Sequence, residues 1–309
     1  MNRRQFVAST LAAGVVVAGA SAKDEERLPI VDTHQHLWDL KKFRLPWIEK
    51  GSHLDHSFLM SDYLKEAKGL NIVKTIYMEV DLDPAQRDQE AEFVIGLCQK
   101  GDNPMAAGVI SGRPASDGFP KYIRRYKDSK YIKGVRQVLH GPSTPAGYCL
   151  DKKFIASIRL LGELGLRFDL CMRPEELLDA AKLIDACPDT RFVLDHCGNA
   201  KVQAKDRRQW EKDIAAVAKR KNVVGKVSGI VVGAKPKEWK PEDLAPIIKH
   251  TLEVFGPERV MFGGDWPVCT RAATLRQWVE ALRTIVSDRP RAEQKKLFHD
   301  NAVAFYNLR

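Results

Sequence analysis

Residues 191–199 read Arg-Phe-Val-Leu-Asp-His-Cys-Gly-Asn, a short apolar run that ends in polar residues and a glycine turn. Such a run is typical of a strand buried on both faces, as in a parallel sheet covered by helices. Seven other runs of this kind occur along the chain, and the eight predicted strands are residues 30–34, 72–80, 106–111, 132–136, 167–172, 191–196, 223–228 and 260–264.

Longer amphipathic stretches separate these runs and predict helices, several of which begin with Pro or Asp, as helix starts prefer. The predicted helices are residues 84–99, 151–164, 175–186, 206–218, 241–255 and 275–287. Strand–helix alternation repeated eight times favours an α/β fold of one domain, a (β/α)8 TIM barrel over residues 29–309, rather than an open doubly wound sheet. Three irregular segments, 38–58, 112–120 and 141–149, are expected to form walls of a site at its rim.

The N-terminus has the pattern of a targeting segment. Arg3-Arg4-Gln5-Phe6 precedes an apolar run over 7–20, and Ala20-Ser21-Ala22 fits a cleavage site. Twin arginines followed by Phe resemble a Tat export signal, while an ordinary Sec signal or an uncleaved anchor are the alternatives. We therefore predict a signal peptide over 1–22, a charged linker over 23–28, and a periplasmic protein without membrane attachment after cleavage.

The composition is that of a soluble globular protein, with 309 residues, 44% hydrophobic and 29% charged. The net charge is +10, and residues 1–22 contribute two arginines and no acid to it, which leaves +8 for the mature chain. The basic residues are spread along the chain without a nucleic-acid-binding motif, so we expect a solvated surface and no nucleic-acid partner. The six cysteines form no C-x-x-C pair and are expected to be free thiols. The oligomeric state stays open.

In a barrel of this type, site residues collect at the carboxyl ends of the strands. The first strand ends with His34-Gln35-His36, and alternate residues of a strand project to the same side, so both imidazoles are expected at the barrel mouth. Such a pair can bind a divalent metal or polarise a carbonyl group. Glu79, at the end of the second strand, is either a third metal ligand or the partner of a neighbouring cation.

The last strand ends with Gly263-Gly264-Asp265-Trp266. The glycines allow a tight turn, and Asp265 is expected to face the histidines, where an acid can accept a proton from attacking water. The alternative is that Asp265 only caps the following helix. His196 follows the sixth strand and is predicted to be catalytic together with Asp265.

Six further positions carry polar or aromatic groups of interest. Arg136 ends the fourth strand and is predicted to stabilise an oxyanion, although a buried ion pair is its alternative role. Lys226 lies within an apolar strand, where a lysine needs either a partner or a substrate to bind. The roles of Asp169 and Arg173 in the fifth strand stay undecided. Trp38 and Trp266 are expected to wall the substrate pocket together with Lys226.

These residues together resemble the amidohydrolase superfamily, in particular its branch of fuconolactonase-like sugar lactonases. The resemblance spans residues 28–308 and is carried by Val31-Asp32-Thr33-His34-Gln35-His36-Leu37-Trp38-Asp39, Arg191-Phe192-Val193-Leu194-Asp195-His196-Cys197-Gly198 and Pro257-Glu258-Arg259-Val260-Met261-Phe262-Gly263-Gly264-Asp265-Trp266-Pro267. Binuclear amidohydrolases place a bridging lysine or glutamate at the end of the fourth strand, whereas this chain has Arg136. The resemblance therefore implies a site with one divalent metal, zinc above others, or with none.

The function implied is that of a hydrolase of carbohydrate metabolism that opens a small lactone, such as a sugar aldonolactone, with activated water. Two alternatives stay open. The first is a metal-dependent decarboxylase of an aromatic or unsaturated acid, which would need the metal at His34, His36, His196 and Asp265. The second is a sugar-acid binding protein without catalytic activity.

Overall fold

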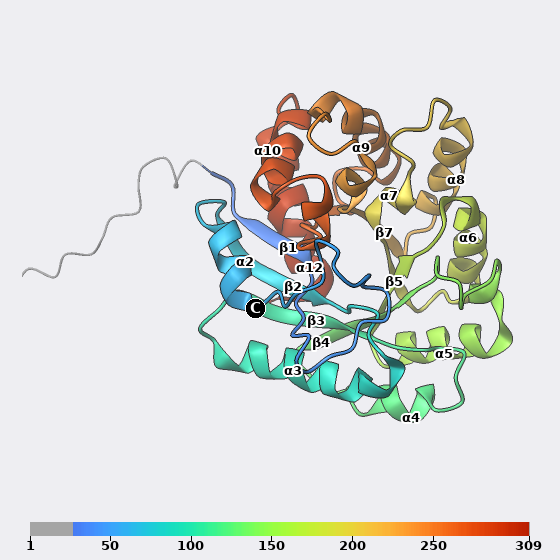
Figure 1. Ribbon diagram of the computed structural model, residues 1–309. Helices are drawn as coiled ribbons and strands as arrows, with labels where there is room; N and C mark the ends of the chain where they lie inside the picture. The colour runs from blue at the N-terminus through green and yellow to red at the C-terminus, as the bar shows by residue number, and fades with distance from the viewer. Residues whose placement is uncertain (1–26, 309) are drawn as a thin grey trace, which may run out of the picture.

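Eight parallel strands follow one another around the centre of the computed structural model, which describes residues 27–308 (Figure 1). They pair in chain order and are β1 (Ile30–Gln35), β2 (Ile72–Met78), β3 (Met105–Ser111), β4 (Ile132–Val138), β5 (Arg167–Cys171), β6 (Arg191–Leu194), β7 (Val223–Val227) and β8 (Val260–Phe262). All eight predicted strands are therefore confirmed, and so is the single-domain (β/α)8 barrel.

Helices surround the strands on the outside of the barrel (Figure 1). The longer ones are α3 (Arg87–Lys100), α5 (Lys152–Glu163), α6 (Leu177–Ala186), α8 (Arg208–Ala218), α9 (Pro241–Phe255) and α10 (Leu275–Ile285). They confirm the six predicted helices, with two differences at their starts: the predicted beginnings of α3 and α6 lie in separate 3-10 turns, Pro84–Gln86 and Pro174–Glu176. The prediction missed the short helices α2 (Met60–Ala67), α4 (Phe119–Arg124), α11 (Arg291–Lys295) and α12 (Asn301–Tyr306).

The barrel closes between β8 and β1 through a few specific contacts rather than a full ladder. Gln35 and Trp266 form an isolated parallel bridge. The Asp265 amide donates to the His34 carbonyl at 2.8 Å, and the His36 amide donates to the Trp266 carbonyl at 2.8 Å. These bonds hold the chain after β8 directly against the end of β1, so the two strands that carry the predicted site residues are fixed to each other.

The buried Asp32 side chain strengthens this closure. Its Oδ1 accepts hydrogen bonds from the amides of His34, at 3.0 Å, and of Gly264, at 2.7 Å. Its Oδ2 accepts the Tyr63 hydroxyl of α2 at 2.7 Å. A Cβ atom on Gly264 would lie 2.5 Å from that oxygen, so the approach of the two strands requires glycine at this position.

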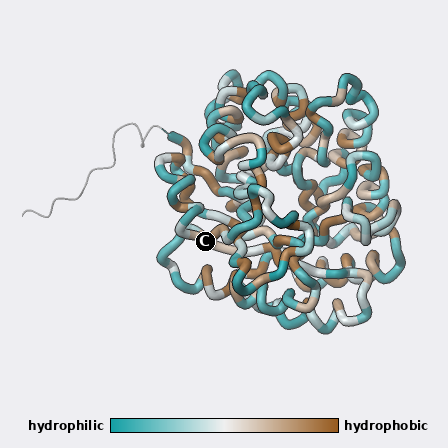
Figure 2. The backbone as a smooth tube through the Cα atoms, viewed as in Figure 1, coloured by the Kyte–Doolittle hydropathy of each residue, from teal (hydrophilic) through white to brown (hydrophobic). Residues whose placement is uncertain are grey.

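Apolar side chains fill the barrel interior and close it toward the amino ends of the strands. Val31, Met78, Val193 and Met261 form a cluster there with the last residues of the described chain. Helix α12 lies at the amino ends of the strands. Two arginines that begin strands, Arg167 of β5 and Arg191 of β6, both donate hydrogen bonds to the Phe305 carbonyl of this helix. The hydrophobic residues are concentrated toward the inside in Figure 2. With that end blocked, the carboxyl ends of the strands offer the open end for a site.

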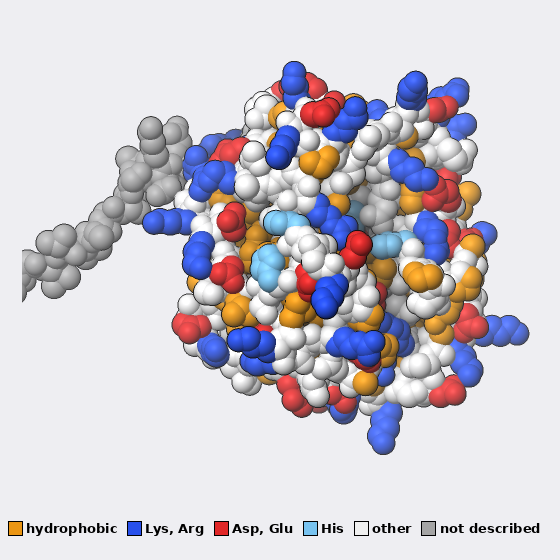
Figure 3. Space-filling model, viewed as in Figure 1, with side chains coloured by type: hydrophobic (Ala, Val, Ile, Leu, Met, Phe, Trp, Pro, Cys, Tyr) orange, Lys and Arg blue, Asp and Glu red, His pale blue; other side chains and the backbone are white. Residues whose placement is uncertain are grey.

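The surface bears many charged side chains. On the face shown in Figure 3, lysines and arginines are scattered around the molecule, and histidines lie near the centre. All six cysteines are buried and unpaired. Among residues 27–308, no helix is long and apolar enough to cross a bilayer. The predicted signal peptide and most of the predicted linker lie outside the described residues.

Candidate active site

The end of β1 brings both predicted histidines to the barrel mouth. The ring centroids of His34 and His36 lie 4.9 Å apart, and both side chains are buried. The Nδ1 atom of His36 lies 3.0 Å from the Met78 carbonyl oxygen and must carry the proton there, since a carbonyl only accepts. In the neutral ring, the lone pair of Nε2 is therefore left free to face the centre of the site.

Asp265 completes this group from the other side of the barrel seam. Its Oδ1 lies 3.3 Å from Nε2 of His36 and 3.6 Å from Nε2 of His34. The backbone of Asp265 has a φ of +54°, which turns the chain sharply at the end of the strand. The prediction that Asp265 faces the two histidines is confirmed in position, and its role in catalysis stays a prediction.

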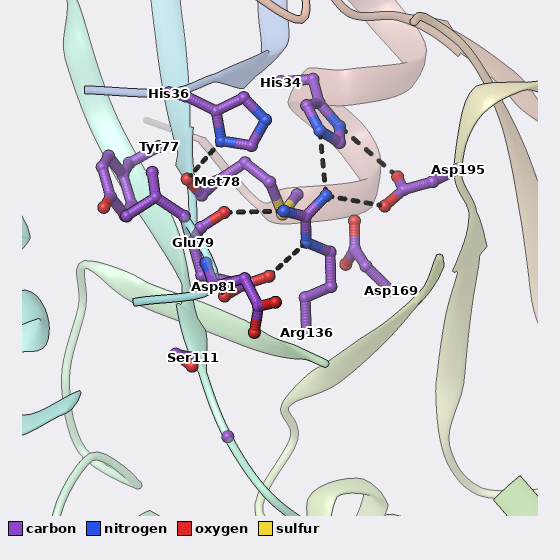
Figure 4. A network of polar contacts seen from close by, with 12 residues as sticks. His34, His36, Tyr77, Met78, Glu79, Asp81, Ser111, Arg136, Asp169 and Asp195 are labelled. Carbon is purple, nitrogen blue, oxygen red and sulfur yellow. Dashed lines mark hydrogen bonds and ion pairs between the residues drawn. The ribbon is translucent and has the colours of Figure 1, made fainter. Parts of the chain in front are cut away.

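Arg136 crosses the mouth from β4 and is paired with Glu79 (Figure 4). Its Nε donates to Oε1 of Glu79 at 2.7 Å, and its Nη2 donates to the Glu79 carbonyl at 2.7 Å. The other carboxylate oxygen of Glu79 accepts the Asp81 amide at 2.7 Å. Glu79 therefore takes the second of its two predicted roles, that of a partner to a cation. It lies outside the described groups whose donor atoms could share one metal ion.

Lys226 is fully buried below the histidines, between two carboxylates. Its Nζ lies 2.7 Å from Oδ2 of Asp169, 2.8 Å from Oδ1 of Asp195 and 3.3 Å from Nδ1 of His34. Burial lowers the pKa of the ammonium group, but the two carboxylates outweigh this effect and hold that pKa above its ordinary value. The structure thus gives Lys226 protein partners, and a contact with substrate stays a prediction.

The two acids beside Lys226 differ in their ionisation. Burial raises the pKa of Asp169 to about 7, even with Lys226 nearby. Burial also raises the pKa of Asp195, but Lys226, His34 and His196 together more than offset it, and this pKa lies well below its ordinary value. Asp195 is therefore the ionised acid of the pair, and its Oδ1 lies 3.5 Å from Nδ1 of His34.

His196 enters the site directly after β6. Its ring centroid lies 4.6 Å from that of His34, and its Nδ1 lies 2.8 Å from the Ser228 hydroxyl. A Cβ atom on Gly229 would lie 2.3 Å from that same nitrogen, so glycine at 229 makes room for the ring. Burial lowers the pKa of both His34 and His196, which keeps both rings neutral at neutral pH.

The two predicted tryptophans are buried near the chain segment that follows β1. Trp38 belongs to that segment, whereas Trp266 follows β8 and packs against it. Trp38 is fully buried, donates from Nε1 to the His56 carbonyl at 2.7 Å, and contacts Phe58 edge to face. Trp266 is 2% exposed and packs against Phe58 and Tyr63. Both rings are therefore buried against other parts of the protein in this structure. Their predicted contact with substrate stays untested.

Another histidine, which the sequence analysis did not single out, follows β4 at the rim. The Arg173 guanidinium donates at 2.9 Å to the carbonyls on either side of His140, those of Leu139 and Gly141. Burial, and then the neighbouring His196, lowers the pKa of His140. Arg173, whose role was undecided, therefore fixes the rim segment that carries this histidine.

The donor atoms at the mouth fit a divalent cation. His34, His36 and Asp265 each offer one ligand atom, and these atoms lie within 4.8 Å of one another; a second such group is His34, Asp195 and His196. Two histidines and one carboxylate are a common ligand set for a catalytic metal that keeps one open position.

The balance of buried charge points the same way. The ion-pair network around His34 contains two cations, Arg136 and Lys226, and the four carboxylates Glu79, Asp169, Asp195 and Asp265. With neutral histidines, the excess of negative charge is one while Asp169, whose pKa is raised to about 7, keeps its proton, and it is two once Asp169 is ionised as well. One divalent cation would balance it, and such compensation is needed because isolated buried charges are costly.

Zinc added to chelator-treated protein is therefore expected to raise the Tm. At free zinc about 100 times the Kd, the gain in the free energy of unfolding is about 2.7 kcal/mol. Thermal unfolding should be compared between the wild type, His36→Asn and His56→Asn, because His56 is an exposed loop histidine and serves as the control. The shift should vanish in His36→Asn and persist in His56→Asn. An equal shift in both variants would show that zinc binds elsewhere.

Comparison with known proteins places this chain among barrel hydrolases. A family model described as amidohydrolase matches residues 31–308. The chain is 25% identical over 293 residues to an L-fucono-1,5-lactonase of Burkholderia multivorans, with 90% of this chain and 96% of that protein covered. It is 20% identical over 339 residues to an L-rhamnono-gamma-lactonase of Scheffersomyces stipitis, covering 90% and 98%. A zinc-bound amidohydrolase structure from Burkholderia multivorans superimposes with a TM-score of 0.81 at 23% identity, covering 91% and 100%.

Proposed function

The chain belongs to the amidohydrolase family, and from this premise we propose that it is a hydrolase that opens a small lactone with activated water. The observation that carries the proposal is the position of Asp265, whose carboxylate lies within 3.6 Å of the Nε2 atoms of His34 and His36 at the barrel mouth. A carboxylate at this position can accept a proton from water. Relatives named as lactonases over nearly the whole chain support the choice of a lactone.

The proposed reaction follows from the roles of the side chains. Asp265 accepts a proton from a water molecule, whose oxygen attacks the lactone carbonyl carbon. Negative charge develops on the carbonyl oxygen, and Arg136 and His196 are the groups proposed to stabilise it. The ring C–O bond then breaks, and the departing alkoxide takes the proton back from Asp265. The product is the open hydroxy acid.

We propose one divalent metal, zinc above others, held by His34, His36 and Asp265. When bound, such an ion polarises a carbonyl group and lowers the pKa of water. The Met78 carbonyl fixes the His36 proton on Nδ1, and the Asp195 carboxylate, 3.5 Å from Nδ1 of His34, favours a proton on that nitrogen too; both Nε2 atoms can then present lone pairs.

For the substrate, we propose a sugar aldonolactone or a related small lactone. Relatives named L-fucono-1,5-lactonase and L-rhamnono-gamma-lactonase support this choice. Trp38, Trp266 and Lys226 remain the predicted substrate-binding residues. Export to the periplasm through a Tat-like signal over residues 1–22 remains part of this proposal.

The test is a pH-indicator screen of purified protein with aldonolactones and pyrone-type lactones, with carbon dioxide release measured in parallel on aromatic acids. We expect acid production from at least one aldonolactone at a rate well above spontaneous hydrolysis. Release of carbon dioxide from an aromatic acid, without hydrolysis of any lactone, would indicate that the protein is a decarboxylase. Thermal stabilisation by sugar acids without turnover of any lactone would indicate a binding protein.

A further inference from the structure

One of the three guanidinium nitrogens of Arg136 makes no bond to Glu79 and contacts other residues. Nε and Nη2 are bound to the carboxylate and the carbonyl of Glu79, both at 2.7 Å. The remaining nitrogen, Nη1, lies 3.2 Å from Nε2 of His34 and 3.7 Å from Oδ2 of Asp195 (Figure 4). Both the guanidinium and the imidazole are buried, so this contact is made away from bulk water.

The chemistry of the two groups fixes the direction of this contact. A guanidinium carries only donors, so Nη1 can satisfy itself at His34 only by donating to the lone pair of Nε2. Nδ1 of His34 then carries the proton and lies 3.5 Å from Oδ1 of Asp195. Lys226, 3.3 Å from this nitrogen, then directs its protons to its nearer partners Asp169 and Asp195, at 2.7 and 2.8 Å. A metal ion would use the same Nε2 lone pair with the same proton on Nδ1. One lone pair cannot serve both partners.

We propose that Arg136 donates a hydrogen bond to Nε2 of His34 in the metal-free protein and competes with a divalent metal for that nitrogen. Arg136 thereby lowers the metal affinity, because a metal can bind Nε2 of His34 only after the hydrogen bond from Nη1 has broken. The two bonds from Arg136 to Glu79 can stay in place. The proposal concerns metal binding and does not depend on which substrate the protein hydrolyses.

The experiment is a titration of the chelator-treated full chain with Co²⁺, followed by the visible absorption of the bound ion. Arg136→Leu removes the competing donors, and E79Q/R136L removes the ion pair as a whole, in case the single variant leaves Glu79 unpaired and unfolds. The matched control is Arg113→Leu with D81N/R113L. This rim arginine also pairs with a carboxylate, at 2.8 Å, and donates to a backbone carbonyl, but it makes no described contact with a histidine.

We expect Arg136→Leu and E79Q/R136L to bind Co²⁺ at least about tenfold more tightly than the wild type, the change expected when one competing charged hydrogen bond is removed. The Arg113 variants should stay within about threefold, as for an exposed ion pair. His34→Gln should abolish binding in every background. Unchanged or weaker binding by E79Q/R136L, or binding that survives His34→Gln, would overturn the proposal. Lactone hydrolysis by the wild type is scored separately, so either proposal can fail alone.

Discussion

Asp265→Asn is expected to lower kcat for lactone hydrolysis by about 10²- to 10⁴-fold, the usual contribution of a general base. The amide keeps the size of the side chain but cannot take a proton from water. The position is held by backbone bonds from Asp265 to His34 and from His36 to Trp266, which the substitution leaves in place. The loss should therefore appear in kcat without a loss of fold, measured by the indicator assay beside circular dichroism.

The matched control is Asp81→Asn, a second acid at the same mouth. Asp81 pairs with Arg113, and its carboxylate is 37% exposed. Because exposed ion pairs contribute at most about 1 kcal/mol, its removal should change kcat/KM by no more than about fivefold. Near-normal lactone hydrolysis by Asp265→Asn would refute the role given to Asp265, and equal losses in both variants would point to a general effect of charge at the mouth.

The strands could be predicted because each is a short apolar run whose local sequence suffices to identify it. The helices missed by the prediction are those with little local signal. Helices α2 and α4 have only eight and six residues, and α11 and α12 have five and six. Helices this short are marginal by themselves and form because the barrel provides a surface to pack against.

The convergence of site residues followed from one rule, that the carboxyl ends of barrel strands meet at one mouth. That rule brings His34, His36, Arg136, His196 and Asp265 together without any knowledge of distances. It does not say which neighbour each side chain meets. Partners depend on the register and twist of neighbouring strands, which a single sequence does not contain.

Asp195 illustrates this limit. It stands directly before His196 in the quoted motif, yet no role was assigned to it, whereas the structure places it between Lys226, His34 and Arg136. The expectation that Lys226 needs either a partner or a substrate was sound, but only the structure supplies the two carboxylates. The burial of Trp38 likewise depends on how the loop after β1 folds back on itself, which its irregular sequence does not reveal.

The second large effect is expected from Lys226→Met, which should lower the free energy of unfolding by about 3–5 kcal/mol, as for the loss of one member of a buried ion pair. Methionine fills the space but leaves Asp169 and Asp195 without their shared cation. Urea unfolding followed by fluorescence measures the loss. The control is Lys182→Met, since Lys182 pairs with Asp179 on the surface at 2.8 Å and should change stability by about 1 kcal/mol at most.

The pH dependence of this loss separates charge from packing. With Lys226 present, burial already raises the pKa of Asp169 to about 7, and without the lysine this pKa should rise further above its unfolded value. The pKa of Asp195, which the lysine helps to hold well below its ordinary value, should rise as well. A carboxyl with a raised folded-state pKa stays protonated in the folded protein and loses its proton on unfolding. Rising pH therefore favours unfolding of the variant, and its deficit should grow from pH 5 to pH 8. D169N/K226M should recover part of the stability at pH 8. A deficit that is constant with pH would mean that the lysine acts through packing, and the charge network described around His34 would then have to be revised.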